Sequence, residues 1–298
     1  MIKPVLRWVG SKRSQAVGLA KELVLGLRPG GRYIEPFLGS ASVALAMRAE
    51  GVESKRMLLG DGLDTLIESY KALVAYPKET IEAFYKLLEK AERARSRNLY
   101  NDLRENTNLE RRQASFDCTP RPELAAQFFY LNVRGFNGLC RENKSGDFNM
   151  TIGRSGYKRG DLRAPKKGDM LDFAAELFGA ELFAGDFEIL IDRAGDGDLI
   201  YADPPYDGTF NSYSKEWKLA DQERLSLALK AASERGAVVY ASNSDTPRIR
   251  ALYGEWCHIQ ERVIQYQVGG AKARRQEGKE VLLISRQGSS TVSTSPIV

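Results

Sequence analysis

The chain has 298 residues, 43% of them hydrophobic and 28% charged, and its net charge of +5 favours a polyanionic partner. Its apolar runs are too short to span a membrane and its N-terminus lacks the features of a secretion signal, so we expect a soluble, cytoplasmic protein. Three widely spaced cysteines and a single histidine, His258, argue against a disulfide framework, a zinc site and most histidine-dependent chemistries, and no metal is expected.

In chain order, the first part of the sequence alternates between strand and helix patterns. A short strand is expected around Tyr33, followed by a glycine-containing turn and a helix whose apolar face runs from Val43 to Ala49. A second strand ends at Asp61, and a helix follows from Leu63 to Leu73. Residues 77–112 are polar and helical in pattern, without a strand signal.

Strand patterns return in the second half of the chain. They occur near Leu182, at Leu199–Ala202 and at Ala237–Ala241, and a final pair, His258–Gln267 and Glu280–Ile284, flanks a basic Gly-Gly loop. The alternation predicts a mostly parallel α/β sheet formed by residues 1–75 and 166–286. A helical, basic insertion occupies residues 76–165, and the polar tail, residues 287–298, is expected to be disordered.

Three turns follow predicted strands at the end of a parallel sheet where ligands bind. They are EPFLGSAS (35–42), GDG (60–62) and ADPPYDG (202–208). The first brings glycine and a helix N-terminus near a ligand, and the second offers the Asp61 carboxylate to ribose hydroxyls. Dinucleotide and triphosphate loop motifs are absent, and Glu35 would repel a pyrophosphate. We therefore expect a nucleoside-type cofactor, preferably one with a positive charge.

Residues 141–168 are strongly basic, with eight Lys or Arg against three Asp or Glu. Aromatic and amide residues precede and overlap this stretch, which favours contact with nucleic acid over a merely solvated basic loop.

Four motifs occur in a fixed order along the chain: LRWVGSK (6–12), IEPFLGSAS (34–42), RGFNGLCRENKSGDFNMTIGR (134–154) and DPPY (203–206). Together they resemble the Dam-like family of DNA adenine methyltransferases over most of residues 1–285. The resemblance implies a Rossmann-like methyltransferase fold with S-adenosylmethionine as cofactor. It also implies methylation of the 6-amino group of an adenine flipped out of double-stranded DNA, in GATC or a related short site.

The DPPY turn suits this chemistry. The lone pair of the adenine amine is delocalised into the ring, so methyl transfer needs alignment more than a strong base. The Asp203 carboxylate and the Pro204 carbonyl can each accept an amine hydrogen, the prolines make the turn rigid, and Tyr206 can stack on the extruded base. The alternative is a plain Pro-Pro turn with a solvated aspartate N-cap. The catalytic residues are expected to be Asp203, Pro204, Pro205 and Tyr206.

The resemblance also assigns binding residues. Those expected at the cofactor are Trp8, Lys12, Glu35, Phe37, Gly39, Ser40, Asp61, Asp186, Phe187 and Asp203. Those expected at the DNA are Arg7, Arg134, Phe136, Asn137, Leu139, Arg141, Lys144 and Thr151, with Arg141 a candidate for a bidentate contact to guanine. Core packing for Trp8 and a helix N-cap for Asp186 are the alternatives. The chain departs from the family pattern at Ala41, usually glycine, at Arg7, usually lysine, and at Thr151, usually proline.

Other functions stay open at this point. An RNA adenine methyltransferase and a catalytically weak DNA-binding relative are the nearest alternatives. Methylation of a cytosine ring is disfavoured, because it needs a cysteine nucleophile, typically after proline, and no cysteine here follows one. The sequence is silent on oligomeric state and on whether the protein serves a restriction system, a phage or a housekeeping role.

Overall fold

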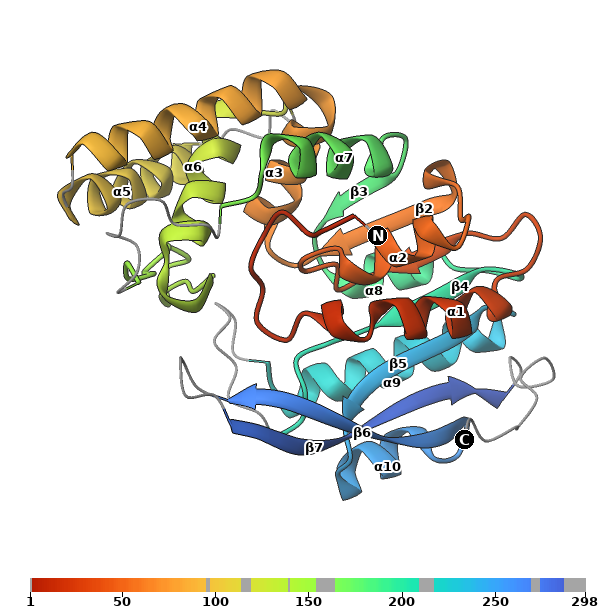
Figure 1. Cartoon of the computed structure of the whole chain (residues 1–298). Coiled ribbons are helices and arrows are strands. Elements are labelled where there is room, and N and C mark those ends of the chain that lie inside the picture. The colour runs from red at the N-terminus through yellow and green to blue at the C-terminus, as the bar shows by residue number, and fades with distance from the viewer. Residues whose placement is uncertain are drawn as a thin grey trace.

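The computed structural model describes residues 2–94, 97–113, 119–138, 140–153, 164–208, 217–268 and 274–286. Within these residues a seven-stranded sheet has the order β3-β2-β1-β4-β5-β7-β6 (Figure 1). The strands are β1 (Tyr33–Glu35), β2 (Met57–Asp61), β3 (Glu181–Ala184), β4 (Leu199–Ala202), β5 (Val238–Ser244), β6 (Cys257–Val268) and β7 (Arg274–Ser285). The first five strands of this order are parallel, whereas β7 runs antiparallel to β5 and β6. The mostly parallel α/β sheet predicted from the sequence is confirmed.

Helices follow the first two strands and occupy residues 77–94 and 97–113 as the sequence predicts, and further helices occur where none was predicted. They are α1 (Ala16–Gly26), α2 (Ser42–Ala49), α3 (Asp64–Ala75), α4 (Pro77–Ala94), α5 (Arg97–Gln113), α6 (Pro122–Arg134), α7 (Lys167–Leu177), α8 (Phe187–Asp192), α9 (Leu219–Glu234) and α10 (Pro247–Tyr253). The last strand begins at Arg274, earlier than expected, because RRQEG at its start lacks the apolar alternation of a buried strand. None of the helices in the described ranges is long and apolar enough to cross a bilayer.

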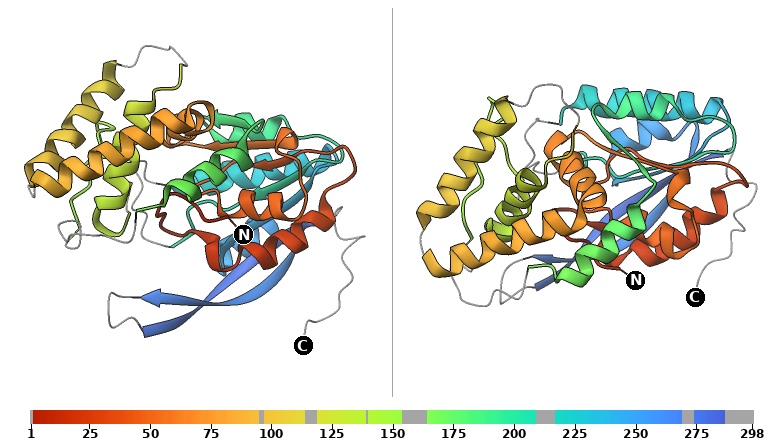
Figure 2. Two further views of the ribbon diagram at one scale, coloured as in Figure 1. Left: turned by 45° about the horizontal axis from the view of Figure 1, so that its top comes forward. Right: turned by 90° about the horizontal axis from the view of Figure 1, so that it is seen from above.

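Alternate residues of each strand are buried on opposite faces of the sheet, because successive side chains of a β-strand point in opposite directions. Tyr33 and Tyr201 belong to a hydrophobic cluster with α1, α2 and α3, whereas Ile34 and Ile200 belong to a second cluster with α8, α9 and α10. The right-hand view of Figure 2 shows α1 and α9 on opposite sides of the sheet. The strands are therefore covered on both faces, which explains their nearly continuous apolar sequence.

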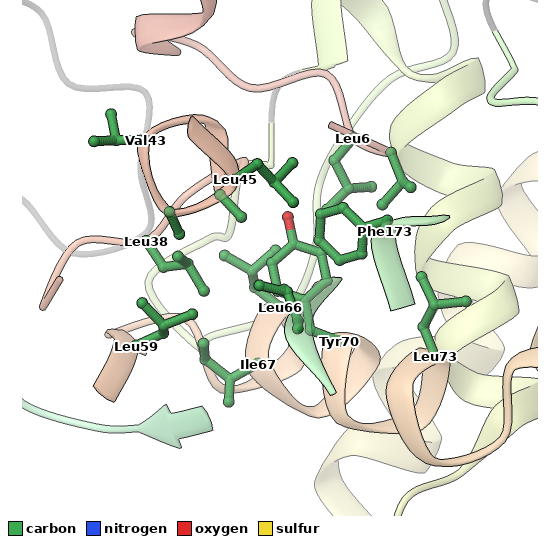
Figure 3. Packing of buried hydrophobic residues seen from close by; sticks show 14 of the residues in the cluster. Leu6, Leu38, Val43, Leu45, Leu59, Leu66, Ile67, Tyr70, Leu73 and Phe173 are labelled. Atoms are coloured by element: carbon green, nitrogen blue, oxygen red, sulfur yellow. The ribbon is translucent and has the colours of Figure 1, made fainter. Parts of the chain in front are cut away.

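The helices between α3 and α7 pack on this same core. Phe84 of α4 and Phe128 of α6 belong to the cluster that contains Tyr70 of α3. Figure 3 shows Tyr70 beside Phe173 of α7, with a distance of 5.0 Å between ring centroids. The helical region is thus anchored to the sheet by continuous apolar packing. Its helices α4, α5 and α6 gather at one end of the molecule, away from the β6–β7 hairpin (Figure 1).

Candidate active site

The three predicted ligand turns come together because β1, β2 and β4 are neighbours in the sheet. β1 pairs with β2 on one side and with β4 on the other, all in parallel, so their carboxyl ends lie at one edge. The chain leaves β1 toward β2 and returns to β4 on the opposite side. Such a reversal of strand order marks the ligand crevice of open α/β sheets.

The glycine turn after β1 is held rigidly at both polar groups of Gly39. Its N–H donates to Asp61 Oδ2 at 2.9 Å, and its carbonyl accepts from the Tyr70 hydroxyl at 2.9 Å. Gly39 has φ +48°, and a Cβ placed there would lie 2.7 Å from Nε1 of Trp8. Only glycine satisfies both the backbone conformation and the close approach of the indole. Trp8 thus covers the turn and also packs against the hydrophobic core, the alternative allowed from the sequence.

Hydroxyl groups join the N-terminal motif to the same turn. Ser11, Ser40 and Ser42 form a triangle in which the Oγ atoms lie 2.8–2.9 Å apart. Between the two turn serines, Ala41 has φ 60°, a left-handed conformation that costs alanine about 1–2 kcal/mol. Its methyl group is buried in the core, and that burial contributes about 0.8 kcal/mol in return. Packing therefore explains much of why alanine is tolerated where the family resemblance implies glycine.

Two acidic residues in these turns differ in their placement. Desolvation raises the pKa of Asp61 to about 6, although the Gly39 and Leu63 N–H groups donate to its carboxylate. Glu35 is 2% exposed, accepts a hydrogen bond from Tyr33 and has its pKa raised well above the ordinary value by burial. The charge that the sequence argument attributed to Glu35 is thus disfavoured, and the side chain supports the turn from within the core.

Lys12 is buried against the DPPY turn. Its ammonium group lies 3.4 Å from Asp203 Oδ1, donates to the Tyr206 hydroxyl, and lies 3.2 Å from each carboxylate oxygen of Glu280. The Tyr206 hydroxyl in turn donates to Asp203 at 3.1 Å. Burial raises the pKa of Asp203, Lys12 opposes that shift, and Glu280 reinforces it. Three members of this cluster were predicted from the sequence, but Glu280 was not, because it lies in a strand sequence that carries no motif.

The turn itself is fixed by side chains from two other elements. Gln222 of α9, buried, donates to the Pro205 carbonyl at 2.9 Å and accepts from Asn243 of β5 at 3.2 Å. Asn243 also accepts from the Asp207 N–H at 3.1 Å. These contacts hold both ends of the Pro205–Asp207 segment. Neither amide was identified from the sequence, because each lies far along the chain from the turn it supports.

An aromatic group lies beside the turn after β1. Phe37, Phe187 and Trp217 pack with ring centroids 5.5–5.6 Å apart. Among the described residues, Trp217 Nε1 has no hydrogen-bond partner although it is buried. Trp217, which precedes α9, was missed from the sequence, and its only signal is an aromatic residue shortly after DPPY.

Asp186 takes the alternative position that the sequence allowed for it. It caps α8 by accepting from the Glu188 N–H at 2.9 Å, and it forms an ion pair with Arg224. The Arg224 guanidinium also lies over the Phe187 ring, 5.0 Å from its centroid. Capping and cofactor contact are compatible, since a carboxylate has several acceptor positions.

The predicted recognition segment, residues 135–152, is hairpin-like in its described part. Backbone bridges pair Gly135 with Ile152 and Glu142 with Phe148. Phe136 is 48% exposed, and Arg141, Lys144 and Thr151 are exposed, as expected of DNA contacts. Leu139 lies outside the described residues, and of Asn137 only the backbone is described, in a short 3-10 helix.

Arg134 does not lie on the surface predicted for it. It is 4% exposed at the end of α6, where its carbonyl accepts from the Gly153 N–H at 2.9 Å. The apolar face of α6 turns this residue into the core, so the prediction of a DNA contact at Arg134 is not supported by its position.

Arg7 contacts the predicted recognition segment and belongs to the same N-terminal motif as Lys12, which contacts the DPPY turn. The Asn132 side chain accepts from the Arg7 N–H at 3.0 Å and donates to the carbonyls of Arg7 at 2.8 Å and Gly138 at 3.2 Å. A Cβ on Gly138 would lie 2.5 Å from that of Arg7. The five residue-to-residue steps from Arg7 to Lys12 span at most about 18 Å. A short stretch of chain therefore links the predicted recognition segment to the DPPY turn.

Within the described part of the chain, no group of three or more His, Cys, Asp or Glu side chains could hold a metal ion. The site instead offers carboxylates, hydroxyls, aromatic rings and backbone amides.

Comparison with known proteins shows which family the amino-acid sequence matches. Residues 8–268 match D12 class N6 adenine-specific DNA methyltransferase. The chain is 34% identical over 255 residues to Retron Ec67 DNA adenine methylase of Escherichia coli, covering 85% of this chain and 81% of that protein. It is 33% identical over 256 residues to a DNA adenine methylase of Vibrio cholerae, with 83% of each covered. It is also 28% identical over 294 residues to Type II methyltransferase M.MjaIII of Methanocaldococcus jannaschii, covering 95% of this chain and 98% of that protein.

Proposed function

The chain belongs to the D12 class of N6 adenine-specific DNA methyltransferases, and from this premise we propose how it methylates its target. The substrate is an adenine flipped out of double-stranded DNA, in GATC or a related short site, and the methyl donor is S-adenosylmethionine. The observation that carries this proposal is the cluster of Lys12, Asp203 and Tyr206, in a chain whose glycine turn is locked to Asp61.

The residues of the crevice fit S-adenosylmethionine. Gly39 keeps the turn open where any Cβ would strike Trp8, and Asp61 can accept from ribose hydroxyls. The Nε1 of Trp217 lies beside Phe37 and Phe187, has no hydrogen-bond partner among the described residues, and can donate to a heterocyclic base. We propose that Trp8, Lys12, Phe37, Gly39, Ser40, Asp61, Asp186, Phe187 and Asp203 hold the cofactor, with Glu35 supporting the turn. When bound, the cofactor supplies a methyl group on a positively charged sulfur.

Asp203 acts on the amine of the target adenine. Its carboxylate accepts one amine hydrogen, and the Pro204 carbonyl accepts the other, which aligns the nitrogen for attack. The neighbouring Pro205 carbonyl is engaged by Gln222, so the turn presents Pro204 in a fixed orientation. Because the pKa of Asp203 is raised, its carboxylate is also a better acceptor for the proton that the methylated amine releases.

Tyr206 provides the surface on which the extruded base stacks. The Lys12 ammonium lies over this ring, 4.6 Å from its centroid, so the base would use the remaining face. Stacking of a base on an aromatic ring contributes about 1–3 kcal/mol, which offsets part of the cost of leaving the duplex.

The DNA sequence is read by the segment around residues 135–152, which lies within the helical insertion proposed for residues 76–165. Arg7, from the N-terminal motif, contributes as well. Arg141 and Lys144 are exposed on the hairpin and carry the charge that DNA attracts. Arg141 is the candidate reader of guanine, Phe136 and Asn137 approach the displaced base pair, and Leu139 and Thr151 complete the surface.

The test is methyl transfer by the purified protein from labelled S-adenosylmethionine to duplex DNA, with RNA of the same sequence as the competing acceptor and EDTA present. We expect 6-methyladenine in the duplex only, at full rate without metal. Transfer to RNA alone would favour the alternative enzyme, and no transfer to either would favour a non-catalytic DNA-binding role. Mapping methyladenine in the genome of an expressing cell then identifies the site.

A further inference from the structure

One face of α5 follows the backbone of the recognition segment. Arg104 donates to the Met150 carbonyl at 2.8 Å, and Arg111 donates to the Gly146 carbonyl at 2.8 Å. Asn108, between them on the helix, bonds to Phe148. Spacings of three and four residues place these side chains on one side of a helix. The segment is therefore held by side chains of a helix distant in sequence.

Asn108 makes the most specific of these contacts. Its Nδ2 donates to the Phe148 carbonyl at 3.0 Å, and its Oδ1 accepts from the Phe148 N–H at 2.8 Å. Asn108 is 7% exposed and Phe148 is 2% exposed. The carboxamide thus pairs with both backbone groups of one residue, as a neighbouring β-strand would. A shift of the strand by one residue would break both bonds.

Arginine side chains fix the same strand on either side of that contact. The Arg111 guanidinium lies over the Phe148 ring, 4.0 Å from its centroid, and also pairs with Glu142. Arg112 pairs with Asp147 at 3.0 Å. Both ends of the hairpin turn are thereby tied to α5.

The strand that Asn108 holds is paired directly with Arg141. The Asn149 N–H donates to the Arg141 carbonyl at 2.9 Å, and Phe148 bridges to Glu142. The position of Arg141 therefore depends on the register of residues 148 and 149. A displacement of about 1 Å is sufficient to lose a well-aligned contact.

We propose that Asn108 is a positioning residue for target specificity: through Phe148, it sets where Arg141 meets the DNA. This inference rests on the proposed function, in which the recognition segment reads the duplex. Asn108 itself contacts no DNA in this account. Its effect is on discrimination between sites and not on the chemistry at DPPY.

The experiment measures methylation of duplexes altered one base pair at a time, for Asn108→Ala and for the isosteric Asn108→Asp, which keeps the acceptor but not the donor. Asn106→Ala is the matched control, since Asn106 is exposed on α5 about 200° around the helix from Asn108. We expect both Asn108 variants to lower the ratio of correct to altered site at least tenfold, with unchanged affinity for S-adenosylmethionine. Asn106→Ala should match the wild type.

A uniform loss of rate at all sites, with the preference profile retained, would overturn the inference and leave Asn108 as a stabilising residue only. If Asn108→Ala fails to fold, the isosteric variant decides. Arg141→Ala, measured in parallel, separates the two proposals. If it relaxes the preference while the Asn108 variants do not, the positioning role fails and the reading role stands. If Arg141→Ala leaves the preference profile unchanged, Arg141 does not read the site. The inference that Asn108 positions Arg141 for reading then fails as well, whatever the Asn108 variants show.

Discussion

The ammonium group of Lys12 lies 3.2 Å from both carboxylate oxygens of Glu280, buried beside the DPPY turn. Lys12 also faces Asp203, so one cation is shared by two carboxylates. Glu280 in this way competes with Asp203 for Lys12, and Asp203 is the residue proposed to accept a hydrogen of the adenine amine.

We expect Glu280→Gln to slow methyl transfer about tenfold, because Lys12 would then pair with Asp203 alone. The negative charge of Glu280 raises the pKa of Asp203, so removing it lowers that pKa. The acid limb of the pH–rate profile should therefore move to lower pH in the variant. Glu255→Gln, an exposed change, serves as the control. An acid limb at the wild-type pH would remove Glu280 from this role.

Asp203→Asn should lower turnover by about 10²–10⁴-fold, because it removes the carboxylate at the reacting amine. Lys12 keeps Glu280 as a partner, so the variant should fold, which circular dichroism checks. Rapid-quench assays measure the chemical step. Near-normal turnover would show that Asp203 does not act on the amine.

Two changes at Tyr206 separate its ring from its hydroxyl. Tyr206→Ala should bind DNA but methylate slowly, since the extruded base loses a stacking contribution of about 1–3 kcal/mol. Tyr206→Phe keeps the ring and removes the hydroxyl contacts to Lys12 and Asp203, so the base should still be held. The fluorescence of 2-aminopurine at the target position reports extrusion. Equal signals and rates in wild type and Tyr206→Ala would make stacking the wrong role.

Arg141→Ala tests base reading against simple attraction. A bidentate contact to guanine predicts a cost of about 1–3 kcal/mol at the correct site and relaxed preference at one base pair. A phosphate contact predicts instead an equal loss at all sites and a salt dependence lower by about one unit. Methylation of single-substitution duplexes at several salt concentrations distinguishes them. An unchanged preference profile would move the reading role to Arg7 or Lys144.

Cofactor affinity should depend on pH through Asp61. Its pKa is raised to about 6, and only the ionised form is a full acceptor for ribose hydroxyls. Affinity should therefore rise about tenfold between pH 5 and pH 7, as the ionised fraction rises. Calorimetric titration with S-adenosylmethionine measures this, and Asp61→Asn should bind more weakly with a flat profile. A persistent slope in that variant would assign the titration to another group.

The mostly parallel sheet, the helices after its first two strands and the three turns at its ligand edge could be predicted from the sequence alone. These features depend on local signals: apolar alternation in strands, Gly39 where the backbone is left-handed, and paired prolines after Asp203. Such signals can be recognised in a few consecutive residues. The four motifs are short stretches of this kind, and their order along the chain therefore also indicated the family.

Which polar residues surround the predicted site depends on the tertiary structure. Glu280, Gln222 and Asn108 stand in segments that read as ordinary strand or helix, and each gains its role from a partner far along the chain. Arg134, which the motif suggested as a DNA contact, is turned inward by the apolar face of α6. A polar side chain buried in a fold is stabilised by its hydrogen-bond partner, and the sequence around it does not identify that partner.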